Sequence, residues 1–280
     1  MSATVAVVGR GFGAAVHAPG WELAGANVVA VAGRDDWRDA IEGADIVSVA
    51  TPPAAHAEVA NAARGKRILC EKPLAATTAE AEAMVAAATA PTAVNFSYRA
   101  LPHFQMFREI RDADEVRVRW TTPSRLRPGP PSWRDDPTQG GALAAYGIHA
   151  LDYLVWMLGP ARVESAQVAG DDDAFTAELR HDRGRSTVTV SLVEKERVHR
   201  LEAGDLVLEN VHPRDPVTAF ALTHGRELVP VEPLRAPAGD YRVAPFAVHA
   251  RALLDDTERP TFTDGLHAQR LLDEIRRAGS

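Results

Sequence analysis

The stretch TVAVVGRGFGAA, residues 4–15, joins a short apolar run to a glycine-rich turn. Gly9, Gly11 and Ala14 fit the pattern G-x-G-x-x-A, directly after a predicted strand and at the start of a predicted helix. Small residues let the backbone approach a pyrophosphate, while the free N–H groups and the dipole of the helix N-terminus attract it. A glycine-rich turn can also be purely structural, but the position after a strand favours a dinucleotide site.

Four more β-rich runs follow this turn, with helical segments between them. Strands that alternate with helices form parallel sheets with right-handed crossovers, so we expect an α/β protein that begins with a Rossmann doubly wound sheet. After a helix at 102–111 the runs have hairpin spacing, which is typical of an antiparallel sheet. The first set lies at 27–33, 45–51, 67–73 and 92–98, and the second at 115–122, 162–170, 173–181, 185–193 and 197–210.

These two patterns divide the 280 residues into two expected domains. Residues 1–98 form the dinucleotide-binding domain, and residues 99–280 form a substrate-binding and oligomerisation α+β domain with a largely antiparallel open sheet. An amphipathic helix at 264–278 is expected to pack back on the body. The proline-rich stretch 121–141 is either a functional lip or a mobile surface loop.

Composition excludes several classes of function. Thirty-eight acidic residues against thirty-one basic ones give a formal charge of -7, and no dense Lys/Arg block occurs, so neither nucleic acid nor an anionic membrane is an expected partner. The single cysteine, Cys70, cannot form an internal disulfide, and neither a signal peptide nor an eighteen-residue apolar span is present. A cytoplasmic location is therefore expected, and no metal site is predicted.

The tip of the second strand bears on which nicotinamide nucleotide binds. NAD-binding folds usually place an acid there to hold the ribose hydroxyls, whereas this chain has Gly33 followed by Arg34. Gly33 has no side chain to reject a 2′-phosphate, and Arg34 could pair with one, which favours NADP over NAD. Asp35 and Asp36 weigh against this, since they either cap the next helix or repel the phosphate.

Five motifs in sequence order resemble the Gfo/Idh/MocA family of oxidoreductases. They cover residues 1 to about 160, and the Glu-Lys-Pro triplet and the G-x-H-x-x-D pattern are the most specific of them. The motifs are GRGFGAAVHAP (9–19), ATPPAAHAEVA (50–60), CEKPLA (70–75), VNFSYR (94–99) and GGALAAYGIHALD (140–152).

The resemblance implies hydride transfer on sugars, polyols or keto compounds, with a homodimer or homotetramer formed through the C-terminal sheet. Lys72 would bond the reacting oxygen, and His149 would be the catalytic histidine that transfers the proton. Core or solvated positions are the alternatives for these two residues. The residues expected to bind the cofactor are Gly9, Arg10, Gly11, Phe12, Gly33, Arg34, Thr51, Pro52, His56, Glu71 and Lys72.

The chain departs from the family pattern at Ala145, where many members have an aspartate that partners the histidine. The alternative function is therefore a nucleotide-binding sensor of the same fold that has lost catalysis. Asp152 either orients the imidazole, binds a substrate hydroxyl or ties down the domain interface, and Arg99 either reaches substrate or forms an ion pair, with Glu71 as one partner. The expected substrate-binding residues are Arg99, Trp133, Arg134, Tyr146, His149 and Asp152.

Overall fold

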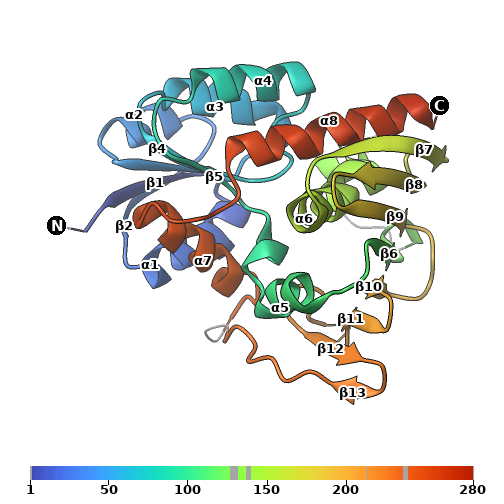
Figure 1. Cartoon of the computed structure of the whole chain (residues 1–280). Coiled ribbons are helices and arrows are strands. Elements are labelled where there is room, and N and C mark those ends of the chain that lie inside the picture. The colour runs from blue at the N-terminus through green and yellow to red at the C-terminus, as the bar shows by residue number, and fades with distance from the viewer. Residues whose placement is uncertain (1, 127–131, 137–139, 213, 236–238, 280) are drawn as a thin grey trace. The chain divides into compact units, whose positions relative to one another are not determined.

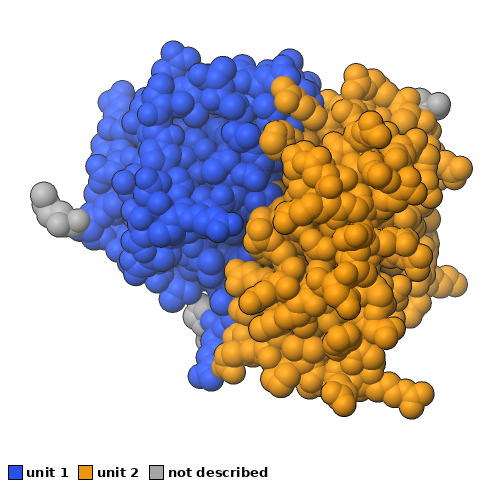
Figure 2. Space-filling view, viewed as in Figure 1, with its two compact units in different colours: residues 1–100, 234–266 blue, residues 101–233, 267–280 orange. Residues whose placement is uncertain are grey.

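The computed structural model describes residues 2–126, 132–136, 140–212, 214–235 and 239–279 (Figure 1). Two compact units make up the chain. One unit contains Met1–Ala100 and Leu234–Leu266, and the other contains Leu101–Pro233 and His267–Ser280 (Figure 2). Within the described ranges, no helix combines the length and the apolar character that a membrane crossing needs.

The first unit is built on a five-stranded parallel sheet with the order β2-β1-β3-β4-β5. Helices α1 and α7 cover one face, and α2, α3 and α4 cover the other (Figure 1). The strands are β1 (Thr4–Val8), β2 (Asn27–Ala32), β3 (Ile46–Val49), β4 (Arg67–Cys70) and β5 (Thr92–Val94). The helical elements are η1 (Gly13–His17), α1 (Ala18–Leu23), α2 (Trp37–Glu42), η2 (Pro53–Ala55), α3 (His56–Ala62), α4 (Thr78–Ala87), η3 (Ser97–Ala100) and α7 (Val243–Leu254).

Local sequence accounts for where these elements begin. Thr77 caps α4 by accepting a hydrogen bond from the Glu80 backbone, and the Glu80 carboxylate accepts one from the Thr77 backbone in return. This reciprocal capping satisfies donors that a helix start leaves unpaired. Because β1 and β3 are buried on both faces, β1 is apolar from Val5 to Val8 and β3 is apolar except for Ser48, rather than alternating.

The second unit contains an eight-stranded sheet with the order β13-β12-β11-β10-β6-β9-β8-β7. Every pair in it is antiparallel except β6 with β9, so the predicted fold class is confirmed. The strands are β6 (Glu115–Thr121), β7 (Ala161–Ala169), β8 (Ala174–His181), β9 (Gly184–Ser191), β10 (Val198–Ala203), β11 (Leu206–Asn210), β12 (Phe220–His224) and β13 (Glu227–Leu228). The helical elements are α5 (Pro102–Ile110), η4 (Ser124–Leu126), η5 (Trp133–Asp135), η6 (Leu143–Gly147), α6 (Ile148–Leu158) and the greater part of α8 (Phe262–Ala278).

One face of this sheet is packed and the other is open. On β6, Val116, Val118 and Trp120 are buried, whereas Glu115 and the arginines between them are exposed. Helix α5 packs on β11 and β12, and α6 packs on β9. Self-association through the open face stays a prediction.

The structure differs from the sequence-based expectation in three respects. The run 197–210 is two strands, because Gly204 adopts φ +58° and turns the chain between β10 and β11. Strands β12 and β13 and helix α7 were not expected. Residues 234–266, placed by the sequence in the domain 99–280, pack in the first unit, because α7 buries Phe246 and Leu253 against the core that surrounds Trp21.

Candidate functional site

The carboxyl ends of β1 and β3 form the switch point of the parallel sheet. These strands are neighbours, but the chain continues to β2 on one side and to β4 on the other, which is where doubly wound sheets bind ligands. Gly9 follows β1 with φ +127°, and a Cβ added there would overlap the carbonyl of Ala50. Only glycine therefore allows the turn to lie this close to the end of β3.

The other small residues of the turn have separate roles. A Cβ added to Gly11 would meet nothing within 4 Å, so its backbone faces open space, as close approach of a phosphate requires. A Cβ added to Gly13 would lie 2.8 Å from Val7 Cγ1, whereas Ala14 is exposed. Close packing of the helix on the strand therefore depends on Gly13, one residue before the position that the G-x-G-x-x-A pattern assigns.

The side chain of Thr51 supports a polar ligand at this edge. Its hydroxyl oxygen is buried at the end of β3 and has no hydrogen-bond partner among the described residues. A buried hydroxyl without a partner costs free energy. Together with the open backbone of Gly11, it fits a dinucleotide lying across the carboxyl ends of the strands.

At the tip of β2, the side chain that lies over Gly33 belongs to Arg10. A Cβ added to Gly33 would lie 3.2 Å from Arg10 Nε, and the guanidinium donates to Asp36 at 2.5 Å. Asp36 also accepts a hydrogen bond from the Gly33 backbone, and that bond, followed by the charge of Arg10, lowers the pKa of this carboxyl. Arg34, which the sequence singled out, is exposed.

Glu71, directly after β4, is surrounded by donors. Its Oε1 accepts from Asn95 Nδ2 at 2.5 Å and from His17 Nε2 at 3.1 Å, and its Oε2 accepts from the Lys72 backbone at 3.3 Å. Burial alone would raise the pKa of this carboxyl, but the hydrogen bond and charge of His17, the hydrogen bond of Asn95 and the charge of Lys72 outweigh burial and lower it. The neighbouring Lys72 is 8% exposed.

His56 holds the other side of the loop that carries Lys72. Its ring is fully buried, with Nε2 2.8 Å from the Thr51 carbonyl and Nδ1 3.0 Å from the Pro73 carbonyl. Burial is the main cause that lowers the pKa of this imidazole. The geometry places His56 as a brace between the loops after β3 and β4, with its ring nitrogens directed at the backbone.

His17, within the GRGFGAAVHAP motif, is a further residue of the candidate site. It lies in the π-helical turn η1, is fully buried, and bonds Glu71 through Nε2 and Ser48 Oγ through Nδ1 at 2.8 Å. A polar residue inside the apolar run of β3 was the available signal, because a buried serine requires a partner.

Arg99 forms an ion pair that the sequence did not assign. Its Nη1 donates to Asp264 Oδ1 at 3.0 Å, and the side chain is 8% exposed. Asp264 in turn accepts from the backbone and hydroxyl of Thr261, which starts α8. Asp264, which the sequence did not indicate, is thus a partner in the ion pair expected as one of the two roles of Arg99.

In the second unit, the run 140–159 begins as a π-helical turn, η6, and continues as α6. Such turns occur often at functional sites. Tyr146 and His149 are half-buried on this segment, whereas Ala145 and Asp152 are 6% and 2% exposed. Of the four, Tyr146 and His149 are the side chains with the greater access to solvent.

An aromatic cluster that the sequence analysis missed surrounds His149. The Trp120 ring centroid lies 6.3 Å from His149 and 5.3 Å from Tyr146, and Trp120 stacks on His199 at 3.9 Å. Burial lowers the pKa of His199 to about 3, so this ring is neutral. The alternation in EVRVRW, which puts Trp120 on the buried face of its strand, was the available signal.

Asp172 fixes the start of the segment that carries His149. Asp172 is 7% exposed and has φ 58°. Its backbone carbonyl accepts a hydrogen bond from the Ala142 backbone at 2.6 Å, and its carboxylate accepts one from the Leu143 backbone at 3.1 Å. Burial is the largest influence on this carboxyl and raises its pKa to about 6, against the opposing effects of Leu143 and Arg276. Compared with the unfolded chain, the folded state therefore favours the protonated form of Asp172.

We expect Asp172→Asn to change how stability depends on pH. A folded pKa above the unfolded one gives a stabilising contribution that is complete below about pH 4 and is lost as pH rises through 6. Asparagine keeps an acceptor and tolerates positive φ, but it does not titrate. The free energy of unfolding of the variant, relative to that of the wild type, should therefore rise by up to about 3 kcal/mol between pH 4 and pH 7.5. Urea unfolding at both pH values measures this, and a difference that does not vary with pH would contradict it.

Trp133 and Arg134 lie in η5, within the proline-rich stretch. Arg134 stacks over the Trp133 ring at 4.7 Å, and Arg125 links Asp135 to Asp173 at 3.2 and 2.8 Å. This part of the stretch is thus tied to the β7–β8 turn. The rest of it, 127–131 and 137–139, lies outside the described residues.

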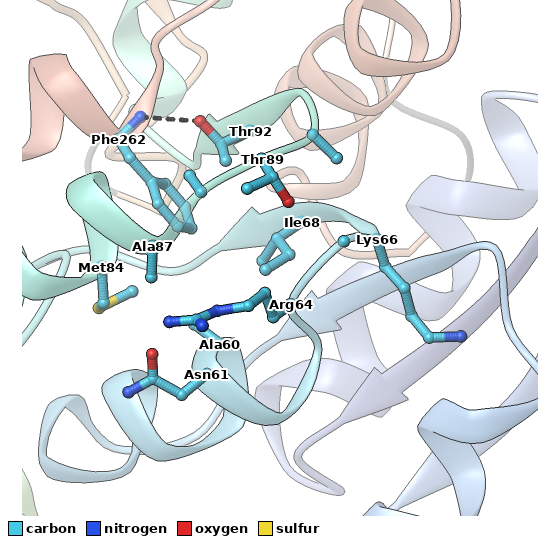
Figure 3. A pocket seen from close by; sticks show the side chains of 13 residues that line it. Ala60, Asn61, Arg64, Lys66, Ile68, Met84, Ala87, Thr89, Thr92 and Phe262 are labelled. Atoms are coloured by element: carbon cyan, nitrogen blue, oxygen red, sulfur yellow. Dashed lines mark hydrogen bonds between the residues drawn. The ribbon is translucent and has the colours of Figure 1, made fainter.

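A small pocket in the first unit lies at the amino-terminal ends of the strands, whereas Gly9 and Thr51 follow the carboxyl ends. Ile68 and Thr92, from the amino-terminal halves of β4 and β5, line it together with Arg64 and Phe262 (Figure 3). Ligands meet parallel sheets at the carboxyl ends of the strands, so this pocket is not the nucleotide site. In the described part of the chain, no group of three or more His, Cys, Asp or Glu side chains is placed to hold a metal ion.

A doubly wound sheet with a glycine-rich turn at its switch point defines a dinucleotide-binding protein. Two family models match the chain: an oxidoreductase family with an NAD-binding Rossmann fold over residues 26–97, and the GFO/IDH/MocA C-terminal domain over residues 109–203. The chain belongs to the Gfo/Idh/MocA family of oxidoreductases.

Individual relatives agree with this assignment. An uncharacterized oxidoreductase of Synechocystis sp. is 26% identical over 98% of this chain and 93% of its own length. Levoglucosan dehydrogenase of Pseudarthrobacter phenanthrenivorans is 34% identical over 44% of this chain, which spans 36% of that relative. A solved structure of levoglucosan dehydrogenase in complex with NADH matches with a TM-score of 0.81 at 19% identity, over 100% of this chain and 97% of that one.

Proposed function

We propose that this chain is an NAD(P)-dependent oxidoreductase that transfers a hydride between nicotinamide C4 and a carbinol or carbonyl carbon of a small sugar, polyol or keto substrate. The observation that carries the proposal is that the backbone around Lys72, at the carboxyl end of β4, is fixed on both sides. Its own N–H donates to Glu71, which also accepts from Asn95, and the carbonyl of Pro73 is hydrogen-bonded to His56. The similarity to levoglucosan dehydrogenase supports a sugar-like substrate.

In this proposal Lys72 and His149 divide the work. The ammonium of Lys72 bonds the reacting oxygen and stabilises the alkoxide character that develops there. His149 takes the hydroxyl proton during oxidation and returns it during reduction, since a histidine side chain can act as general base or general acid. The buried Trp120 ring packs near His149 and limits how that ring can turn.

A sensor that binds nucleotide without turnover is the second candidate. Ala145 favours it, because the site lacks the carboxylate that many family members place there. A panel of sugars, polyols and keto sugars, followed by the absorbance of the reduced cofactor, separates the two. Tight cofactor binding with no turnover on the whole panel would support the sensor.

We further propose a preference for NADP, supported by Arg10 over a side-chain-free Gly33. Arg10→Ala should weaken NADPH binding by roughly tenfold and NADH binding by much less, because one charge-assisted hydrogen bond is worth about 1.5 kcal/mol. Fluorescence titration of both reduced cofactors measures this. Arg38→Ala, which removes a nearby exposed arginine paired with Glu58, is the matched control. Equal or tighter binding of NADH by the wild type would defeat the preference.

A further inference from the structure

A buried chain of hydrogen bonds runs from helix α1 to the loop that carries Lys72. Trp21 Nε1 lies 2.8 Å from Ser48 Oγ, which lies 2.8 Å from His17 Nδ1, and His17 Nε2 lies 3.1 Å from Glu71 Oε1. Trp21, Ser48 and His17 are all 0% exposed. His17 and Trp21 lie four residues apart on the continuous helical segment formed by η1 and α1, and Ser48 joins them from β3.

Hydrogen-bonding capacity fixes the direction of the two outer bonds of this chain. The Trp21 N–H can only donate, so Ser48 Oγ accepts from it. An ionised Glu71 carboxylate can only accept, so His17 Nε2 carries a hydrogen and donates to it. The bond between Ser48 Oγ and His17 Nδ1 joins the two, and its donor depends on whether Nδ1 also carries a hydrogen.

Glu71 stands at the end of the chain and next to Lys72. Asn95 and the Lys72 backbone also donate to its oxygens. Other titratable or charged groups whose electrostatics involve Glu71 are Lys72, His56, His249, Cys70 and Arg242. Burial lowers the pKa of His56 and His249, whereas Lys72 and Arg242 carry positive charge near Glu71, and a positive charge on His17 would also lower the pKa of this carboxyl.

We propose that His17 is a positioning residue, which, backed by Ser48 and Trp21, keeps the Glu71 carboxylate ionised and in place beside Lys72. The Phe246 ring packs against the imidazole of His17 with its centroid 4.2 Å away and its plane tilted by 33°, and this contact holds the imidazole in its orientation. The role deepens the proposed function, in which Lys72 polarises the substrate oxygen. It can nevertheless be measured without turnover.

The chain contains three lysines, Lys66, Lys72 and Lys195, which makes Lys72 accessible to NMR. Protein labelled with ¹³C at lysine Cε gives three signals, and Lys72→Ala identifies the one of interest. Titration of a neighbouring carboxylate appears as an inflection in that signal on the acid side. Glu71→Gln must abolish the inflection, which assigns it to Glu71.

Loss of the donors should move this inflection upward. In Ser48→Ala and His17→Leu we expect a rise of about one pH unit, because an isolated buried carboxyl resists ionisation. His17→Gln should return the inflection most of the way to its wild-type position, since its amide reaches the Nε2 position. Trp21→Phe, which removes only the N–H, should give a smaller rise and replaces His17→Leu if that variant does not fold.

Phe246→Leu is the control for an effect of packing alone. It alters the ring contact with His17 and leaves the hydrogen bonds among Trp21, Ser48, His17 and Glu71 in place. An inflection that stays in place in Ser48→Ala and His17→Leu, or moves equally in Phe246→Leu, would overturn the proposal. If no substrate is turned over but the inflection moves as expected, the proposed function fails and the role of His17 stands. If turnover is found and the inflection does not move, the proposed function stands and the role of His17 fails.

Discussion

Lys72→Ala is expected to lower kcat by about 10²–10³-fold, with a much smaller change in affinity for the reduced cofactor. The physical reason is that a preorganised donor to a developing oxyanion contributes this much to a rate. Stopped-flow absorbance of the reduced nicotinamide gives kcat, and fluorescence titration gives the affinity. The loss of rate should persist at saturating substrate, because the missing interaction strengthens only in the transition state.

The matched control for Lys72→Ala is Lys195→Ala. Lys195 is exposed in the segment between β9 and β10, so its loss removes a lysine of the same charge from a different region. Wild-type turnover is expected in that variant. Turnover by Lys72→Ala that equals the wild type would remove Lys72 from the mechanism.

The second large effect is expected from His149→Asn. Loss of a positioned proton-transfer group typically costs about 10²–10⁴-fold in rate, and the limb of the pH profile that the imidazole produces should disappear. Measurements of kcat across neutral pH test both parts. Asparagine keeps polarity at this half-buried position while removing a titratable ring.

His224→Asn provides the control for His149→Asn. His224 is exposed at the end of β12, and its replacement should leave both kcat and the pH profile unchanged. A His149→Asn enzyme that retains the pH dependence of the wild type would show that another group transfers the proton. In that case Tyr146, which also packs against Trp120, would be the next residue to replace.

The sequence predicts the parallel sheet well, because the evidence is local. The glycines after β1, the Thr-Pro-Pro after β3 and the Glu-Lys-Pro after β4 each follow their strand directly. Once parallel order is assumed, the carboxyl ends of these strands must meet at one edge. The alternating runs from 115 onward predict the second sheet in the same way.

Interactions between distant segments were not predictable in this way. The pairing of His17 with Glu71 spans 54 residues, and that of Arg99 with Asp264 spans 165. No periodicity relates such positions. Trp120 beside His149 depends on which strand α6 packs near, and β12 and β13 are too short to give a clear pattern.

The return of residues 234–266 to the first unit affects how the protein is made. Helix α7 buries Phe246, Ala250 and Leu253 against Trp21 and Leu69, so the apolar face around Trp21 has no cover until α7 is present. During translation, the glycine-rich turn and the strands before residue 100 leave the ribosome long before α7 does. We therefore expect a fragment ending at residue 98 to expose this apolar face and to aggregate rather than fold alone, which light scattering of the purified fragment would measure.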